Sequence, residues 1–412
     1  MQHSKARFTA LVAVLVLETG AHAQTTWYVD VNGTPPGTGT PTDPYTSLQY
    51  ALDRPTTLDL HTLRVAPGTY RENVTIQKSV YVIATAGALQ TKIEPLAAGR
   101  VLLLDFDVTA QVIGFTVSGG FGPSGDGVVM RAGGLLRSIV RDNSRNGVSV
   151  DYDGWVADCT IVNNASAGFW VQPVAGAGSI SGSLLWQNGT VDAGSPAAGF
   201  ISVSYCAGLS GWISGGTGNV YGDPGLWDLP QGDLHLAPFS PCINAGNPAL
   251  PLDPDGSRRD IGALVYDALY APAPSTYCTG KTNSQGCVPA IGAIGTASAS
   301  AATPFTISAV NIVENRPGLL LFGLAPQAQA FQGGWLCIQP PLKRVGAQNS
   351  GSSGVPCSGV YAFDMKAYVQ SGAHPGLVPG EIGYCEWWGR DPLDPAGFGS
   401  SLSDALSFGI AP

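Results

Sequence analysis

The stretch "SIVRDNSRNGVSV" (Ser138–Val150) aligns with "TIVNNASAGFWV" (Thr160–Val171), and "SLLWQN" (Ser183–Asn188) restarts the same phrase. Each copy contains apolar segments of a few residues separated by Gly, Asn or Asp, which is typical of short strands and tight turns. The copies follow one another at a step of roughly 22 residues. A step of this length, with two or three strands in it, predicts one coil of a parallel β-helix.

An asparagine marks the same point of each copy, because Asn143, Asn164 and Asn188 recur at steps of 21 and 24 residues. Gly147 and Gly168 also recur at a step of 21. Coils of a β-helix stack about 4.8 Å apart, so residues of equal phase lie above one another. We therefore expect a ladder of side-chain amide hydrogen bonds, which explains the repeated Asn without a ligand. Antiparallel sandwiches are the alternative, and the common step favours the helix.

Two further segments carry a resemblance to a known superfamily. "DPYTSLQYAL" (Asp43–Leu52), followed by "HTLRVAPGTYRENVTIQKSVYVIATAG" (His61–Gly87), looks like the first coil of the pectin-lyase-like superfamily. "SPCINAGNPALPLDPDGSRRDIGALVYD" (Ser240–Asp267) resembles the segment that ends many bacterial secreted β-helix proteins. The resemblance implies a right-handed parallel β-helix whose open end is covered by a short helix at Tyr45–Leu52. It implies a fold and secretion, but no reaction.

The rest of the chain has a different character. "YAPAPSTY" (Tyr270–Tyr277) has the composition of a linker. Phrases in Cys278–Pro412, such as "TASASAATPFTISAV" and "GWLCIQPPLKRVGAQNSG", resemble a C-terminal module of exported bacterial proteins with unrelated front ends. We expect an all-β protein, with the right-handed parallel β-helix over 24–269, the linker over 270–277 and a smaller β-sandwich-like domain over 278–412.

The first residues predict export. Lys5 and Arg7 precede an apolar run from Phe8 to Leu17 and the small-residue pattern at 21–23, so 1–23 is expected to be a secretory signal peptide. That run is too short to span a membrane, which needs about 20 apolar residues. Because this leader carries a net charge of +1 and the whole chain −9, the mature chain is expected to carry −10. An acidic chain with scattered basic residues is not expected to bind nucleic acid or an anionic membrane. The expected location is outside the cell or at its surface.

All eight cysteines lie after the predicted leader. In an exported protein an even number predicts disulfides, and Cys278 with Cys287, followed by Cys337 with Cys357, are the pairs that we expect. Zinc is the competing interpretation. It is less favoured because the chain has no CxxC and its histidines lie far apart in the sequence.

The sequence shows no familiar catalytic motif. The motifs of pectate lyases, polygalacturonases and pectin methylesterases are not recognisable, and a G-x-S-x-G elbow and a phosphate-binding loop are also missing. This favours a protein that binds polysaccharide at or near the cell surface over an enzyme. A polysaccharide lyase or glycoside hydrolase with an unfamiliar site on the helix face is the first alternative. A structural spacer or surface-attachment protein is the second.

Candidate carbohydrate contacts come from the strand alternation. If the repeats share a phase, Val148, Val150, Phe169 and Val171 point into the core and Trp170 points outward. An exposed Trp beside carboxylates suits a sugar, whose ring stacks on indole while its hydroxyls hydrogen bond to carboxylates. The alternative is that the carboxylates are turn residues and that Trp170 covers a neighbouring coil. The candidate contacts are Arg141, Asp151, Asp153, Trp170 and Trp186.

Two further sets remain open. Asp253, Asp255 and Asp260 in "DPDGSRRD" offer oxygen ligands for calcium, but the spacing lacks the later ligands of an EF-hand, and a structural turn is favoured. The aromatic residues of the C-terminal domain form either a carbohydrate-binding face or buried core, and core is favoured. They are Trp335, Tyr384, Trp387 and Trp388.

Overall fold

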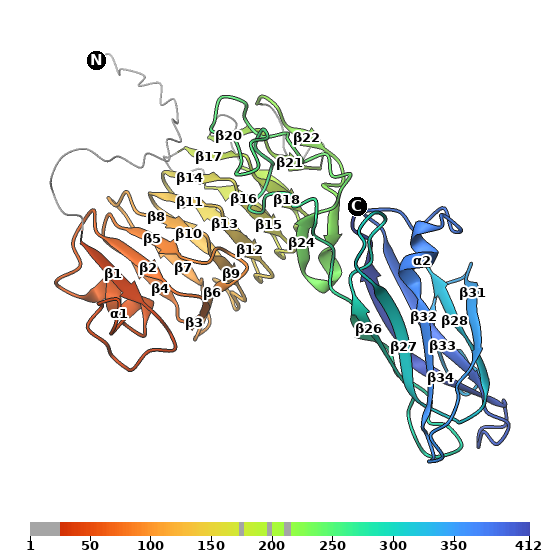
Figure 1. The fold of residues 1–412 in the computed structure, drawn as a ribbon. Helices are drawn as coiled ribbons and strands as arrows, with labels where there is room; N and C mark the ends of the chain where they lie inside the picture. The colour runs from red at the N-terminus through yellow and green to blue at the C-terminus, as the bar shows by residue number, and fades with distance from the viewer. Residues whose placement is uncertain (1–24, 173–176, 196–199, 210–215) are drawn as a thin grey trace, which may run out of the picture. The chain divides into compact units, whose positions relative to one another are not determined.

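The computed structural model describes residues 25–172, 177–195, 200–209 and 216–412 (Figure 1). The predicted signal peptide therefore lies outside the described residues. The chain forms two compact units. The first runs to Gly225 and includes Ser240–Val265, and the second contains Leu226–Phe239 and Tyr266–Pro412. None of the helices in the described residues is long and apolar enough to cross a membrane.

The first unit is a parallel β-helix, as the repeat predicts. The chain passes in turn through three parallel sheets, which we number 1 to 3 in the order that each coil visits them (Figure 1). Sheet 3 has six strands, one for each complete coil. The coil is expected to be right-handed, because parallel crossover connections almost always are.

The strands of sheet 1 are β1 (Thr26–Val29), β2 (Thr62–Val65), β5 (Tyr81–Ala84), β8 (Gln111–Ile113), β11 (Gly134–Leu136), β14 (Gly154–Ala157), β17 (Gly178–Ser181) and β20 (Ile201–Ser204). Those of sheet 2 are β3 (Gly68–Arg71), β6 (Thr91–Glu94), β9 (Thr116–Ser118), β12 (Ile139–Arg141), β15 (Thr160–Val162), β18 (Leu184–Trp186), β21 (Ala207–Gly208) and β22 (Val220–Tyr221). Those of sheet 3 are β4 (Val74–Ile76), β7 (Leu102–Leu104), β10 (Val128–Met130), β13 (Val148–Val150), β16 (Ala167–Val171) and β19 (Val191–Gly194).

The register confirms the predicted phase of the repeats. Val148 pairs with Phe169 and Val150 with Val171, and all four side chains are buried in the core that runs through the coils. Stacked Val, Ile, Leu and Phe side chains of successive coils fill this core, since one coil alone cannot bury its apolar face.

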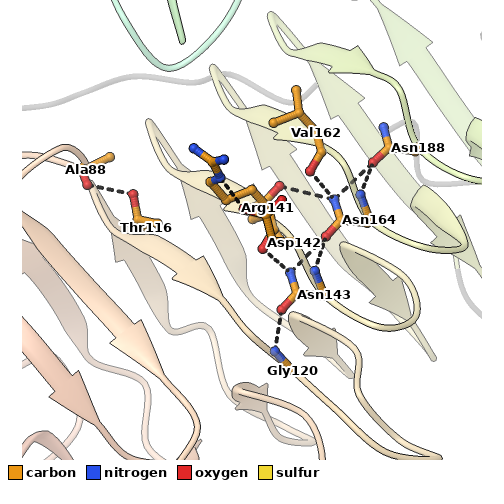
Figure 2. Close-up of polar contacts among 10 residues, drawn as sticks. Ala88, Thr116, Gly120, Arg141, Asp142, Asn143, Val162, Asn164 and Asn188 are labelled. Carbon is orange, nitrogen blue, oxygen red and sulfur yellow. Dashed lines mark hydrogen bonds and ion pairs between the residues drawn. The ribbon is translucent and has the colours of Figure 1, made fainter. Parts of the chain in front are cut away.

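The predicted asparagine ladder forms at the corner between sheets 2 and 3 (Figure 2). Asn164 Oδ1 accepts hydrogen bonds from Nδ2 and N of Asn143, at 2.8 and 3.3 Å. Asn188 Oδ1 accepts from Nδ2 and N of Asn164, at 3.0 and 3.2 Å. The ladder begins at the amide of Gly120 and ends at the carboxylate of Asp192, which accepts from Asn188 Nδ2 at 3.1 Å. All three asparagines are buried, so the ladder is structural.

The repeated glycines make room for this ladder. A Cβ atom on Gly147 would lie 2.7 Å from Asn164 Nδ2, and one on Gly168 would lie 2.7 Å from Asn188 Nδ2. Each glycine therefore allows the asparagine of the next coil to approach the backbone closely.

A second ladder, which the sequence did not predict, lies at the corner between sheets 1 and 2. Ser138 Oγ accepts from the amide of Phe115, and Ser183 Oγ accepts from the amide of Cys159, at 3.2 and 3.0 Å. Cys159 and Cys206 are free, buried thiols at this corner, and burial raises the pKa of both, to about 12 for Cys206. These two cysteines are structural members of the ladder and not disulfide partners.

The capping helix is present as α1 (Leu48–Asp53), three residues later than expected at its start, because Ser47 is its N-cap. Glu72, from the "PGTYRE" turn, accepts from the amides of Leu48 and Gln49 at 2.9 and 2.8 Å. The Gln49 side chain in turn pairs with both N–H and C=O of Thr75, at 2.7 and 3.2 Å. The helix thus provides hydrogen-bond partners for the backbone groups of Thr75 at the edge of β4, the first strand of sheet 3.

Residues 240–265, which we call the strap, pack against the outer surface of sheet 2. Ala263 N–H donates to Thr160 Oγ1 at 3.0 Å, and a buried ion pair joins Arg259 to Asp158. Burial raises the pKa of Asp158, while the charge of Arg259 opposes that rise. The strap therefore covers this part of sheet 2. The segment that resembles the end of secreted β-helix proteins thus packs on the outside of the β-helix.

The second unit is built from antiparallel sheets that enclose a common core, as expected for a β-sandwich. One sheet contains β25 (Ser275–Tyr277), β34 (Ser400–Gly409), β33 (Ile382–Arg390), β28 (Pro317–Gly323) and β31 (Lys343–Asn349). The other contains β26 (Ala290–Gly295), β27 (Phe305–Ile312) and β32 (Gly359–Asp364). The remaining elements are the hairpins β23 (Leu226–Asp228) with β24 (Asp233–Leu236) and β29 (Pro326–Phe331) with β30 (Gly334–Ile338), and the helices η1 (Leu229–Gln231) and α2 (Met365–Gln370).

Part of the expected linker is a strand in this unit. Ser275–Tyr277 forms β25 and pairs with β34, so the irregular segment ends before Ser275. This strand forms because it pairs with β34, which lies far away in the sequence. The composition of residues 270–277 alone therefore cannot predict it.

The structure corrects the disulfide pairing. The four expected cysteines do form two disulfides, but Cys278 bonds to Cys337 and Cys287 to Cys357. The predicted pairs Cys278–Cys287 and Cys337–Cys357 are wrong: Cys278 directly follows β25 of one sheet, Cys287 lies before β26 of the other, and each bonds to a cysteine of a distant segment. Lys281, in the loop between them, makes a buried ion pair with Asp394 at 2.6 Å.

Candidate functional site

The structure separates the predicted carbohydrate contacts onto different faces. Arg141 and Trp186 end strands of sheet 2 and share one outward column, with Val162 between them. Two coil spacings, about 10 Å, thus separate Arg141 from Trp186. Arg141 also makes an ion pair with Asp142 beside the asparagine ladder (Figure 2).

Trp170 lies on the outward face of sheet 3 and packs against its neighbouring coil. A Cβ atom on Gly194 would lie 3.1 Å from the Trp170 ring, so the indole covers that glycine. Asp151 and Asp153 follow β13, in the loop that leads from sheet 3 to sheet 1. Asp153 Oδ1 accepts from the amide of Ala177 at 3.0 Å. Of the predicted set, only these two aspartates lie in the same loop.

A row of polar side chains follows sheet 3, at the position directly after each strand. The register aligns Ile76, Leu104, Met130, Val150 and Val171, the last residues of five successive strands. After each of the last four strands, the following residue also donates its amide to the carbonyl at the end of the previous strand, at 2.8 to 3.0 Å. We call this row the strip, and it consists of Gln77, Asp105, Arg131, Asp151 and Gln172.

Hydrogen bonds and ion pairs join the first four side chains of the strip. Gln77 Nε2 donates to Asp105 Oδ2 at 3.0 Å, and Arg131 Nη1 donates to Asp105 Oδ1 at 2.8 Å. Arg131 Nε lies 3.8 Å from Asp151 Oδ2. One guanidinium therefore bridges two carboxylates that belong to coils on either side of it.

The two carboxylates have pKa values that are shifted in opposite directions. Hydrogen bonds from Gln77, Arg131 and the amide of Phe106 lower the pKa of Asp105 to about 2. Burial raises the pKa of Asp151, against the opposing charge of Arg131. Asp105 is therefore a fixed anion, and Asp151 takes up a proton more easily than an ordinary aspartate.

Two aromatic side chains flank the strip and are exposed. Phe106 is 49% exposed and Tyr152 is 42% exposed, and their rings meet edge to face with centroids 5.5 Å apart. The Arg131 guanidinium lies 4.7 Å from the centre of the Phe106 ring. The aromatic pair is thus held in place by the charged residues while its rings remain accessible.

A small pocket lies at the α1 end of the strip. It encloses about 180 Å³ and is lined by Leu52, Asp53, Thr75, Gln77 and Lys78. Because Gln77 belongs both to this pocket and to the strip, polar groups continue from the pocket along successive coils. The arrangement forms an elongated polar surface parallel to the stacking direction of the coils.

The charge of the strip limits what it can bind. The loops after β7 and β13 contribute Asp105, Asp107, Asp151 and Asp153, and Arg131 is already bonded to two of these carboxylates. A polyanion would face net repulsion here, whereas the hydroxyls of a neutral sugar can donate to carboxylates. The exposed rings can stack on the apolar face of a pyranose.

A repeated motif marks this site in the sequence. Residues 105–107 are Asp-Phe-Asp and residues 151–153 are Asp-Tyr-Asp, two coils apart. Only the second copy is predicted from the sequence, because the aligned repeats begin at Ser138. Asp105, Phe106, Arg131 and Tyr152 are not predicted, although extending the repeat toward the N-terminus could have found them.

The proposed calcium ligands are engaged in the turn of the strap. Asp253 Oδ2 accepts from the amide of Asp260, Asp255 Oδ1 from that of Ser257, and Asp260 Oδ1 from that of Asn244, at 2.7 to 2.9 Å. Within the part of the chain that the structure describes, no group of three or more His, Cys, Asp or Glu side chains could hold a metal ion. The hydrogen bonds explain these aspartates as turn residues.

The aromatic residues of the second unit do not share one surface. Trp387 is buried and stacks on Tyr361, with ring centroids 5.1 Å apart. Tyr384 and Trp388 are partly buried beneath the β29–β30 hairpin, and Trp335 is 46% exposed. These residues therefore form core with one exposed member.

Comparisons with known proteins give no family. No family model and no curated protein matches the chain. Among solved structures, the crystal structure of pectate lyase Pel9A is 15% identical, with a TM-score of 0.34 over 60% of this chain and 98% of that one. The tailspike protein 2 of Escherichia coli O157:H7 bacteriophage CAB120 is 10% identical, with a TM-score of 0.19 over 85% of this chain and 64% of that one.

Proposed function

We propose that the β-helix binds an uncharged polysaccharide along the strip, outside the cell or at its surface. The observation that supports this most is the repeated Asp-aromatic-Asp motif, which places exposed Phe106 and Tyr152 beside the carboxylates of Asp105 and Asp151, two coils apart. The motif recurs after two coils, about 10 Å, which suits a ligand that is itself a repeating chain. The two disulfides agree with an oxidising, extracytoplasmic location.

Binding should depend on the aromatic pair. The double variant Phe106→Ala, Tyr152→Ala is expected to weaken binding at least tenfold, because each ring contributes about 1 kcal/mol or more of stacking and burial. Binding is measured by affinity electrophoresis of the purified chain in neutral glucans, galactans and mannans, with polygalacturonate and alginate as polyanions. The matched control is Phe121→Ala, Tyr221→Ala, since these rings are 48% and 53% exposed elsewhere on the same unit.

Two outcomes would contradict this proposal. One is that the double variant binds as well as its control, and the other is that polyanions bind in preference to every neutral polymer. The same mixtures are assayed for new reducing ends, with and without a chelator. The opposite pKa shifts of Asp105 and Asp151 are the observation that favours a glycoside hydrolase as the second candidate. New reducing ends that disappear in Asp151→Asn would establish it.

A further inference from the structure

The two sheets of the second unit each end in a strand with an unpaired edge, and these edges face one groove. Among the described residues, β31 pairs only with β28, and β32 pairs only with β27. The two strands meet at one end, where the Val360 N–H donates to the Ser350 carbonyl at 2.8 Å. Beyond that point, hydrogen bonds of one side chain join the two strands.

That side chain is Gln348, and it takes the place of a missing strand. Its Oε1 accepts from the Ala362 amide at 3.1 Å, and its Nε2 donates to the carbonyls of Ala362 and Gly346 at 2.8 and 3.1 Å. A side-chain amide has the same donor and acceptor as a peptide group. The edge of β32 is thus already paired in the way that the backbone of an added strand would pair it.

The groove beyond Gln348 is open and has the lining that an extended peptide needs. It has a volume of about 590 Å³. The aromatic rings of Phe363 and Tyr368 line it, together with small residues that leave room for a backbone. Gly346 has a φ of +61°, and a Cβ atom there would lie 2.5 Å from the Phe363 ring, so glycine lets that ring lie under the strand.

The contrast with α1 shows what is special about this groove. Gln49 pairs with Thr75 in the same manner, but there the helix that carries Gln49 covers the edge. Gln348 lies on the edge strand itself, and among the described residues its side chain is the group that a ligand must displace from the edge of Ala362. Lys343, the exposed first residue of β31, carries a positive charge at the end of that strand away from Ser350, while Asp364, which lines the groove, already accepts from the Ala367 amide.

We propose that the groove between β31 and β32 binds an extended peptide segment of another protein by strand addition. The backbone of the peptide replaces the Gln348 amide at Ala362. Small apolar side chains contact Phe363 and Tyr368, and an acidic residue reaches Lys343. This site is independent of the glycan strip and gives the second unit a role in attachment to a protein partner.

The test uses the full chain and a labelled ten-residue probe of alternating Thr and Val with Glu at each end, followed by fluorescence anisotropy. Gln348→Ala is expected to bind the probe at least fivefold more tightly than the unchanged protein, because the competing amide is gone. Ala367→Trp, which fills the groove from an exposed position of α2, is expected to abolish binding in both backgrounds. A copy of the probe with N-methylated backbone amides is expected not to bind.

The proposal is overturned if Gln348→Ala binds the probe no better than the N-methylated copy. It is also overturned if Gln348→Ala forms dimers without the probe in sedimentation experiments, since the occupant would then be a second copy of this chain. Circular dichroism confirms that each variant is folded. Hydrogen exchange provides a second measurement, because the probe is expected to slow exchange in residues 359–364.

Discussion

Replacing Asn164 by alanine is expected to lower the free energy of unfolding of the β-helix by roughly 3–5 kcal/mol. The Asn164 side chain donates to the carbonyls of Val140 and Val162 and to Asn188, and it accepts from two nitrogens of Asn143. All of these groups are buried, and each one that is left without a partner costs about 1–3 kcal/mol. Urea unfolding followed by circular dichroism measures the loss.

Two companion variants make this result specific. Asn164→Asp keeps the volume but replaces the donor Nδ2 by a carboxylate oxygen, which then faces three acceptors, so it should destabilise the helix at pH 7 at least as much as alanine does. Asn32→Ala, at an exposed asparagine outside the ladder, is expected to change the free energy of unfolding by less than about 0.5 kcal/mol. Equal losses at positions 32 and 164 would show that the ladder contributes nothing of its own.

The second large effect concerns Glu386, a buried carboxyl beneath the β29–β30 hairpin. Its Oε2 accepts from the Cys337 amide at 2.9 Å, while Oε1 has no hydrogen-bond partner among the described residues. Burial raises the pKa of Glu386 to about 8, although the Cys337 amide acts in the opposite direction. The folded unit therefore holds this carboxyl in its neutral form at pH 7.

The stability of the second unit should fall as the pH rises from about 5 to 8. In this window the folded state keeps a proton that the unfolded state has released, so the free energy of unfolding decreases with pH. A pKa difference of this size corresponds to roughly 4–5 kcal/mol in all. Guanidinium unfolding at a series of pH values measures the slope.

Glu386→Gln should remove this part of the pH dependence and be the more stable protein at pH 8, because glutamine is permanently neutral. Glu381→Gln, at an exposed position of the same unit, is the matched control and should keep the slope of the unchanged protein. If Glu386→Gln and the unchanged protein lose stability in parallel between pH 5 and 8, the prediction that Glu386 is protonated in the folded state is wrong.

The coil repeat and its corner asparagines were predictable because they depend on local, repeated sequence. A period close to one coil fixes which side chains stack, so Asn143, Asn164 and Asn188 predict the ladder before any coordinates are known. The capping helix was predictable because the segments Asp43–Leu52 and His61–Gly87 resemble the first coil of a known superfamily, and in the structure Ser47 and Glu72 of these segments meet at the helix N-terminus.

The remaining features depend on contacts between distant parts of the chain. Arg259 of the strap makes an ion pair with Asp158, and the two residues lie 101 positions apart in the sequence. No local sequence pattern predicts this ion pair. The disulfides join residues 59 and 70 positions apart, whereas sequence proximity had suggested nearer partners. Of the residues at the candidate site, only Asp151 and Asp153 were predicted. Arg131 lies between Asp105 and Asp151 only because the coils stack, and the sequence around Arg131 does not show this.

The proposed glycan binding at the strip is tested most directly by hydrogen–deuterium exchange of the full chain, with and without the neutral polymer that is retained most strongly in affinity electrophoresis. Slower exchange is expected at residues 105–107, 131–133 and 151–153, where the Asp-aromatic-Asp loops and Arg131 lie. Exchange at residues 139–145, on sheet 2 and its corner, should stay unchanged. Protection confined to sheet 2 or to the second unit, with the three loops unaffected, would contradict glycan binding at the strip.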